Sequence, residues 1–442
     1  MARMAPRWLM AACVLSAPSA ALGDVGFAGF GEPRLYSNGH ISLSMRTGDI
    51  DGDGFIDVVT AGSPTLAILL NDGSGGFNLH KSIPIAGNLR DAVITDYTGD
   101  GIQDLIVVGG SAPLNEPPDT IGRMFALPGL GGAEFGDPVV HFAGVQPVGV
   151  DAGDVNGDGH IDVITSNQLS ASVSVFLNDG EGMFLQPVAY IVGNVPQRVT
   201  MVDLDLDRDL DVVVTNGFGD SISVLRNPGD AKFVVESQIP TTVSATIRAS
   251  VADITGDGFP EVALGKSLEQ IMTVHVNGKG TLGLAMSQAT TIASPRVNLA
   301  DMDGDGDADA VTLGRETPLF PSLPIISVML NDGTGVFDAN QPVIPAGPGS
   351  TSPPDIATAD FDNDGDIDVA FLVAFQAVTV MLNQTIAPNA TDLTEDGLVD
   401  GADLGELLRA WGQPGAADFD DSGTVDGHDL AHLLSQWTLQ TP

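Results

Sequence analysis

Short apolar segments alternate with acidic loops throughout residues 49–368. Each loop follows the pattern D-x-[DNT]-x-D-x-x-x-[DE], with an apolar segment before it and a β-branched run after it, such as Val163-Ile164-Thr165. A third apolar segment follows in most repeats and ends at a turn, as Val173–Leu177 does before Asn178-Asp179-Gly180. A fourth often begins at Phe, as at Phe184. Asn-Asp-Gly between apolar runs is typical of a β-hairpin, so each repeat is predicted to form four antiparallel strands.

The acidic pattern occurs seven times, with start-to-start spacings of 47, 58, 49, 50, 48 and 59 residues. A period near 50 with strand-like segments predicts propeller blades or a solenoid. The seventh repeat stops after its third strand, Val378–Leu382, whereas an unattached fourth-strand sequence, Phe30–Tyr36, stands near the N-terminus. Pairing these two segments would remove open sheet edges. We therefore expect an all-β fold, a closed seven-bladed β-propeller over residues 24–385.

The acidic loops carry a donor pattern that suits calcium, which takes six to eight oxygen ligands in flexible geometry. Carboxylates at loop positions 1, 3, 5 and 9 and the carbonyl of position 7 can surround one ion. Seven copies at fixed internal spacing argue against plain acidic turns, although such calcium usually stabilises a hairpin and performs no chemistry. The predicted ligands, loop by loop, are Asp49, Asp51, Asp53, Phe55 and Asp57; Asp96, Thr98, Asp100, Ile102 and Asp104; Asp154, Asn156, Asp158, His160 and Asp162; Asp203, Asp205, Asp207, Asp209 and Asp211; Asp253, Thr255, Asp257, Phe259 and Glu261; Asp301, Asp303, Asp305, Asp307 and Asp309; and Asp360, Asp362, Asp364, Asp366 and Asp368.

The seven loops are unequal in their predicted affinity for calcium. Loops one, six and seven keep acids at positions 1, 3, 5 and 9 and glycine at position 6, which permits a sharp turn. Loop three has Asn156 at position 3. Thr98 and Thr255 at the same position predict weaker binding in loops two and five. Loop four has Arg208 at the glycine position, which predicts a strained turn.

These repeats resemble the FG-GAP/VCBS type of integrin α-subunit propellers and of many secreted bacterial proteins, over about residues 27–385. The resemblance implies a seven-bladed propeller with calcium in hairpin loops on one face.

Residues 392–442, after a linker at 386–391, hold two further twelve-residue acidic loops, each followed by an apolar helical pattern. Both loops have acids at positions 1, 9 and 12, as in an EF-hand, with Asp in place of the final Glu. The predicted ligands of these loops are Asp392, Thr394, Asp396, Asp400 and Asp403, and Asp418, Asp420, Ser422, Asp426 and Asp429. The first helical pattern runs through Leu404, Leu407, Leu408 and Trp411, and the second through Leu430, Leu433, Leu434 and Trp437.

This duplicated unit resembles the dockerin module of secreted bacterial proteins. The resemblance implies a cohesin-like partner bound through residues 392–442. The pairs that follow position 9, Gly401-Ala402 and Gly427-His428, differ from each other, so the partner's identity cannot be read from them. The alternative is a self-contained calcium-stabilised tail.

The net charge of the chain and the sequence of its N-terminus indicate which partners it can bind and where it is located. Net charge is −41, which excludes nucleic acid as a partner, because binding it needs a basic surface. Residues 1–23 read as a secretion signal, with Arg3 and Arg7 before a short apolar run. Cys13, the single cysteine, lies in that segment, so a lipoprotein anchor there is the alternative to cleavage. No later apolar run is long enough to span a membrane, and we expect a secreted or surface-associated monomer.

No catalytic constellation stands out, so the preferred interpretation is a non-enzymatic extracellular binding or adhesion protein. His428 and His432 lack the glutamate of a zinc protease motif. The alternatives are a secreted polysaccharide-degrading enzyme, a lyase or glycoside hydrolase, and a structural surface-layer protein. Because acidic residues are numerous, a pair of carboxylates for glycoside hydrolysis remains an alternative.

A protein or polysaccharide ligand is predicted on the face opposite the calcium loops. The long spacings come from insertions at Gly109–Gly122 and Gly314–Pro324, between second and third strands. Variable loops on a rigid scaffold often bind ligands, although Pro/Gly-rich insertions are also simply tolerated. The candidate contact residues are Arg123, Arg315, Leu319 and Phe320.

Overall fold

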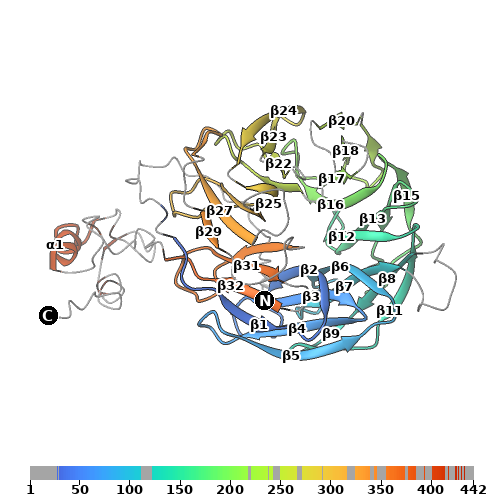
Figure 1. The fold of residues 1–442 in the computed structure, drawn as a ribbon, viewed down its shortest axis with the longest axis horizontal. Helices are drawn as coiled ribbons and strands as arrows, with labels where there is room; N and C mark the ends of the chain where they lie inside the picture. Colours follow the sequence, from blue (N-terminus) through green and yellow to red (C-terminus); the bar gives the residue numbers. More distant parts are fainter. Residues whose placement is uncertain are drawn as a thin grey trace, which may run out of the picture.

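Seven antiparallel sheets of four or five strands surround a common centre, as the ring in Figure 1 shows. The sheets follow one another along the chain, so each is one blade of a β-propeller, as predicted. The structure is a computed structural model, and it describes residues 27, 29–110, 122–217, 221–236, 238–241, 249–265, 271–290, 292–315, 324–338, 343–345, 355–373, 377–384, 393, 401–413, 417, 424–425, 427, 430 and 433. The predicted signal segment, 1–23, lies outside these residues.

The first three strands of every blade form a regular meander, with neighbouring strands joined in chain order. Blades one to three consist of β2 (Ile41–Gly48), β3 (Asp57–Ser63), β4 (Thr65–Asn71) and β5 (Phe77–Pro84); β6 (Asn88–Thr95), β7 (Asp104–Gly110), β8 (Gly122–Leu127) and β11 (Val139–Ala143); and β12 (Pro147–Gly153), β13 (Asp162–Asn167), β14 (Ser172–Phe176) and β15 (Val188–Ile191). A two-stranded hairpin, β9 (Gly129–Gly131) with β10 (Glu134–Phe135), follows β8.

The later blades repeat the arrangement, with a less regular outer strand. Blades four to seven consist of β16 (Pro196–Val202), β17 (Asp211–Asn216), β18 (Ser221–Arg226), β19 (Val234–Val235) and β20 (Ile239–Pro240); β21 (Ala249–Ala252), β22 (Glu261–Gly265), β23 (Ile271–Asn277) and β24 (Leu282–Ala289); β25 (Ala293–Ala300), β26 (Asp309–Arg315), β27 (Pro324–Asn331), β28 (Phe337–Asp338) and β29 (Val343–Pro345); and β30 (Ile356–Ala359), β31 (Asp368–Val373), β32 (Ala377–Met381) and β1 (Arg34–Ser37). In blade three the outer strand begins at Val188, and Phe184 forms only an isolated bridge to Asn178.

The N-terminal segment closes the ring, as the sequence predicts. Strand β1 pairs antiparallel with β32, from Arg34 opposite Val380 to Ser37 opposite Ala377. An isolated bridge from Phe30 to Asn383 extends this contact. The chain therefore supplies the outer strand of its last blade from its own beginning, and that sheet has four strands like its neighbours.

Seven apolar clusters, one between each pair of adjacent blades, form the core. One cluster joins blades one and two through Leu66 and Leu105, and another joins blades seven and one, where the rings of Phe77 and Phe361 meet edge-to-face. The other five occupy the remaining junctions. Each sheet is covered on both faces by its neighbours. In blades three and four, the second strand is therefore buried at every position. This burial explains the continuous β-branched runs that follow the acidic loops.

Asparagine side chains join adjacent blades next to the acidic loops. Each amide nitrogen donates one hydrogen bond of 3.0–3.3 Å to a carbonyl of its own blade's loop and one of 2.7–2.9 Å to the loop of the preceding blade. In blade two the equivalent residue is Gly129, which has no side chain to make this link. The residues that form these links are Asn71, Asn178, Asn227, Asn277, Asn331 and Asn383.

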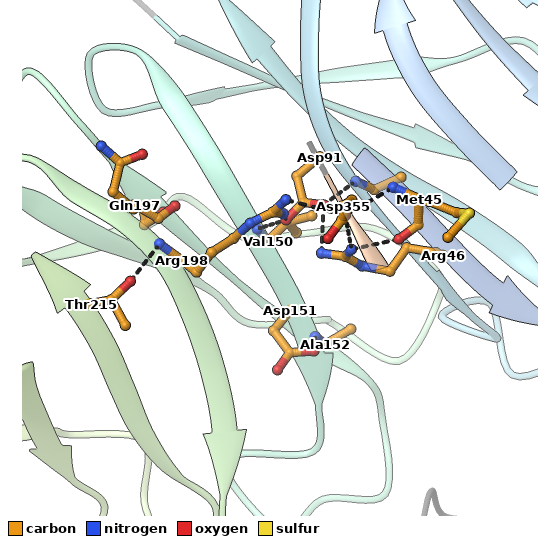
Figure 2. Close-up of polar contacts among 12 residues, drawn as sticks. Met45, Arg46, Asp91, Val150, Asp151, Ala152, Gln197, Arg198, Thr215 and Asp355 are labelled. Carbon is orange, nitrogen blue, oxygen red and sulfur yellow. Dashed lines mark hydrogen bonds and ion pairs between the residues drawn. The ribbon is translucent and has the colours of Figure 1, made fainter. Parts of the chain in front are cut away.

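A network of opposite charges joins blades one, two, four and seven, so it also links blades that are not adjacent, as Figure 2 shows. Arg46 of blade one lies 3.3 Å from Asp355 of blade seven and also pairs with Asp91 of blade two. Arg198 of blade four reaches both Asp91 and Asp355. The two carboxylates are at most 1% exposed, so pairing is what makes their burial tolerable. These two arginines are therefore neutralised inside the ring.

In the C-terminal region the structure describes one helix and a small apolar cluster. Helix α1 (Gly401–Arg409) covers most of the first predicted helix. Leu407 is fully buried against Ala417, Val425 and Leu433, whereas Leu408 is exposed. Gly412 donates to the carbonyl of Val425 at 2.9 Å, which ties the two halves together.

Candidate metal centres

Each acidic loop joins the first strand of a blade to the second, and its first carboxylate organises the turn. One oxygen of the position-1 side chain accepts a hydrogen bond of 2.7–3.1 Å from the amide of position 6 in all seven loops. The position-5 carboxylate accepts one of 2.9–3.0 Å from the amide of position 7, also in all seven. The loops therefore share one backbone path, as the repeated pattern predicts.

The last acid of each loop has a second role that sequence reasoning missed. One oxygen of the position-9 carboxylate accepts a hydrogen bond of 2.6–3.3 Å from the amide that ends or follows the third strand. In six loops the other oxygen accepts from the amide of position 2 or 3. This carboxylate therefore holds the loop onto the blade, and a metal would use only its remaining lone pairs. The side chains concerned are Asp57, Asp104, Asp162, Asp211, Glu261, Asp309 and Asp368.

Carboxylate oxygens gather closely in four of the loops. In loops one and four, the acids at positions 1, 3 and 5 each offer an oxygen within 4.8 Å of the others. In loops six and seven, the acids at positions 1, 3 and 9 do so. Loops two, three and five have Thr98, Asn156 and Thr255 at position 3, so they bring fewer charges to the same place.

Loops six and seven contain acceptor atoms that no donor in the described chain reaches. The Oδ1 atoms of Asp303 and Asp362 are buried and have no hydrogen-bond partner. The hydroxyl oxygen of Thr255 at the same position of loop five is also unpartnered. A buried carboxylate oxygen without a partner is costly, because it has lost water and gained nothing. A hard cation at this position would satisfy it, so the donor set fits calcium.

Burial and neighbouring negative charges raise the pKa values of several acids in these loops. Burial, together with the charge of Asp305, raises the pKa of Asp303 to about 7. Burial raises the pKa of Asp309 to about 8, with Asp303 and Asp305 adding to the effect. In loop seven, burial raises the pKa of Asp368 to about 7. Without a cation these carboxyls retain protons near neutral pH, and metal binding must displace them.

The metal-free protein is expected to lose stability as pH rises from 5 to 8. A carboxyl whose folded pKa lies above its unfolded value of 3.8 binds more protons in the folded state, so its contribution is present at low pH and is lost as pH rises through the folded pKa. Each such group costs up to about 1.4 kcal/mol per pH unit in that window. Melting curves in chelator and in calcium should therefore diverge as pH rises, and a constant gap would contradict this assignment.

Backbone conformation explains why glycine recurs in the loops. Positions 4 and 6 have positive φ throughout, for example 85° at Gly52 and 95° at Gly54. Loop four adopts the same path without glycine, with Leu206 at 61° and Arg208 at 80°. An L-residue in this region costs about 1–2 kcal/mol, so the strain predicted from Arg208 is present in the structure.

Arg208→Gly is expected to stabilise the protein by about 1 kcal/mol, because it removes this backbone strain. Chemical unfolding of the two proteins measures the difference. Gly54→Ala in loop one is the matched control: a Cβ there would have free space around it, so a loss of stability reports the cost of φ alone. A loss on Arg208→Gly would contradict the shared loop geometry.

The acidic loops lie at one end of the strands, and the strand ends that flank the long insertions lie at the other. Turns between third and fourth strands pack on the loops; a Cβ on Gly73 would meet the ring of Phe55 and one on Gly180 would meet His160. The insertions join β7 to β8 and β26 to β27, at the other end, as predicted. Arg123 lies in β8 opposite Phe142, and Arg315 ends β26. Leu319 and Phe320 lie outside the described residues.

The ligands predicted in the C-terminal loops fall almost entirely outside the described residues, and Asp403 lies in α1. Among the described residues, no helix is long and apolar enough to cross a membrane.

Comparison with known families identifies the repeats. The FG-GAP-like repeat model matches residues 49–107, 154–214, 203–264 and 301–371, more than half of the chain. No protein of curated function matches significantly.

Among solved structures, BBS1N crystallised in complex with ARL6DN and soaked with mercury aligns with a TM-score of 0.55 at 12% identity, covering 80% of this chain and 97% of that one. A lectin from Agrocybe aegerita that recognises non-reducing terminal N-acetylglucosamine aligns with a TM-score of 0.48 at 19% identity, covering 78% and 86%. The first likeness supports the propeller fold, and at this identity it extends no further.

Proposed function

Because the chain belongs to the FG-GAP-like repeat family, we propose that it is a secreted, calcium-binding propeller that serves as an extracellular binding or adhesion scaffold. Its ligand is a protein or a polysaccharide, and the ring itself performs no chemistry. The calcium ions hold the loops of one face, and the ligand binds to the opposite face.

The observation that carries the proposal is the pair of buried, unpartnered carboxylate oxygens on Asp303 and Asp362. Each of these two side chains also offers a carboxylate oxygen within 4.8 Å of oxygens from two further carboxylates of its own loop. Like charges at this separation repel one another strongly away from water, and a divalent cation converts that repulsion into attraction. The residues that would hold calcium in these loops are Asp301, Asp303 and Asp309, and Asp360, Asp362 and Asp368.

The architecture supports a binding role. Blades are tied to one another by apolar clusters, asparagine links and the Arg46–Asp91–Arg198–Asp355 network. Such a rigid frame presents loops at low conformational cost, which is where binding residues concentrate. The structurally similar BBS1N was crystallised with a protein partner, which supports testing a protein ligand first.

We propose that residues 392–442 are a dockerin-like module that attaches the propeller to a cohesin-like partner. Support comes from the duplicated loop pattern and from the small core in which Leu407 packs against Val425 and Leu433. Calcium in its two loops would order this core.

Affinity capture from the producing organism's envelope tests the proposal. Three baits are compared in calcium: the full chain, a chain ending at residue 391, and a full chain with residues 316–323 replaced by a short turn. We expect the truncation to lose one set of partners and the shortened insertion to lose another. Identical captures by all three folded baits would contradict both the tail and the ligand face, and release of oligosaccharides from captured polysaccharide would contradict the non-enzymatic role.

A further inference from the structure

In each blade, one residue at the end of the third strand or directly after it lies across from the final acid of the acidic loop. The strand register is the same in all seven blades, because the residue after that acid pairs with the residue one place earlier on the third strand. Six of these seven described positions hold an apolar residue, and blade four holds an arginine. In blade order they are Leu70, Pro128, Leu177, Arg226, Val276, Leu330 and Leu382.

Arg226 places its guanidinium among the carboxylates of loop four. Its Nη1 atom contacts the carboxylate of Asp211, at loop position 9, and lies 3.8 Å from that of Asp205, at position 3. Its Nε atom donates to Glu236 at 3.2 Å. The side chain of Arg226 is only 15% exposed and that of Asp211 only 2%, so this is a partly buried, charge-assisted contact.

A second departure brings another cation to the same loop. The turn between the third and fourth strands of blade five packs on loop four, where a Cβ on Gly280 would lie 2.4 Å from Cβ of Asp205. In that turn Lys279, with φ of 58°, holds the positive-φ position that glycine holds in blades one, three, four and six. Lys279 and Arg226 line one hollow of about 380 Å³ together with Asp205 and Asp207.

We propose that loop four carries its own cation, the guanidinium of Arg226, and takes no calcium, in contrast to loops one, six and seven. The inference rests on the calcium role proposed above. Without Arg226, the acids of loop four are close enough to hold a metal ion. The guanidinium already pairs with the carboxylates of positions 3 and 9, and it would repel a divalent ion. Arg226 therefore stabilises the acidic loop of blade four without calcium.

Hydrogen–deuterium exchange on the full chain, read loop by loop by mass spectrometry, tests the inference in calcium and in chelator. In the unchanged protein, we expect calcium to slow exchange in segments 49–57, 301–309 and 360–368 by roughly tenfold or more, and to leave 203–211 unchanged. Arg226→Leu installs the residue found in blade six and should make 203–211 respond to calcium. Leu330→Arg is the reciprocal variant and should abolish the response of 301–309.

The outcomes separate this inference from the calcium proposal. A calcium response of 203–211 in the unchanged protein, or none in Arg226→Leu while the other loops respond, would overturn the inference. If no loop responds to calcium, the calcium proposal fails. The role of Arg226 is then tested by comparing the two proteins in chelator. There, Arg226→Leu should speed exchange of 203–211 by roughly tenfold, because a charged hydrogen bond is lost. Unchanged exchange there would show that Arg226 is not the loop's cation.

Discussion

Stripping calcium from the purified chain with excess chelator is expected to lower its unfolding midpoint by ~10 °C or more. A site saturated at a hundred times its dissociation constant adds about 2.7 kcal/mol of stability, and several sites add up. Removing the ions also leaves the carboxylates within loop six, and those within loop seven, close together, with the Oδ1 atoms of Asp303 and Asp362 unpartnered. Both effects act on the native state alone, so the loss should be large.

Thermal melting with chelator, with calcium restored, and with magnesium restored gives the comparison. Calcium should return the original midpoint, whereas magnesium should return little of it, because magnesium demands near-octahedral geometry and keeps its waters. An unchanged midpoint in chelator would contradict a structural role for calcium in the ring.

Removing the N-terminal strand is expected to open the ring and cause aggregation. A chain that begins at Asn38 lacks β1, so the apolar strand β32 becomes an open edge of its sheet. It also loses Tyr36, whose hydroxyl donates to the carbonyl of Gly75 at 3.0 Å and whose ring packs on Phe77 of blade one. An exposed apolar edge is a template for pairing with another chain.

Size-exclusion chromatography of chains beginning at Asp24 and at Asn38 measures this effect. Tyr36→Ala in the longer chain is the matched control: it keeps the backbone pairing with β32 and should cost only about 1–2 kcal/mol, because the side chain is half-buried. A soluble, monomeric short chain with the original melting temperature would show that β1 does not close the ring.

Local sequence patterns predicted most of the fold because each blade is a meander with short connections. The apolar runs gave the strands and the acidic pattern gave the loop between the first and second strands. The unattached Phe30–Tyr36 predicted the closure of the ring by β1, and the long spacings predicted where the insertions lie. All of these predictions depend on residues that are close in sequence or on counting the strands of each repeat.

The contacts between blades could not be predicted in this way, since their partners lie far apart in sequence. The asparagine of the turns was read only as a hairpin residue, yet the amide of Asn383 reaches across to the carbonyl of Met302. The central ion pairs left a faint signal: Asp91, Arg198 and Asp355 each stand five residues before an acidic loop. Arg226 left a clearer one, as the single charge at a position that is apolar in the other blades.

Counting bound calcium by native mass spectrometry tests the central claim most directly. The chain should retain several calcium ions, and Asp303→Asn and Asp362→Asn should each lower the count by one. Asp332→Asn, an acid in a hairpin turn of the same blade as Asp303, should leave the count unchanged. A metal-free mass at saturating calcium, or equal counts in all four proteins, would contradict the account.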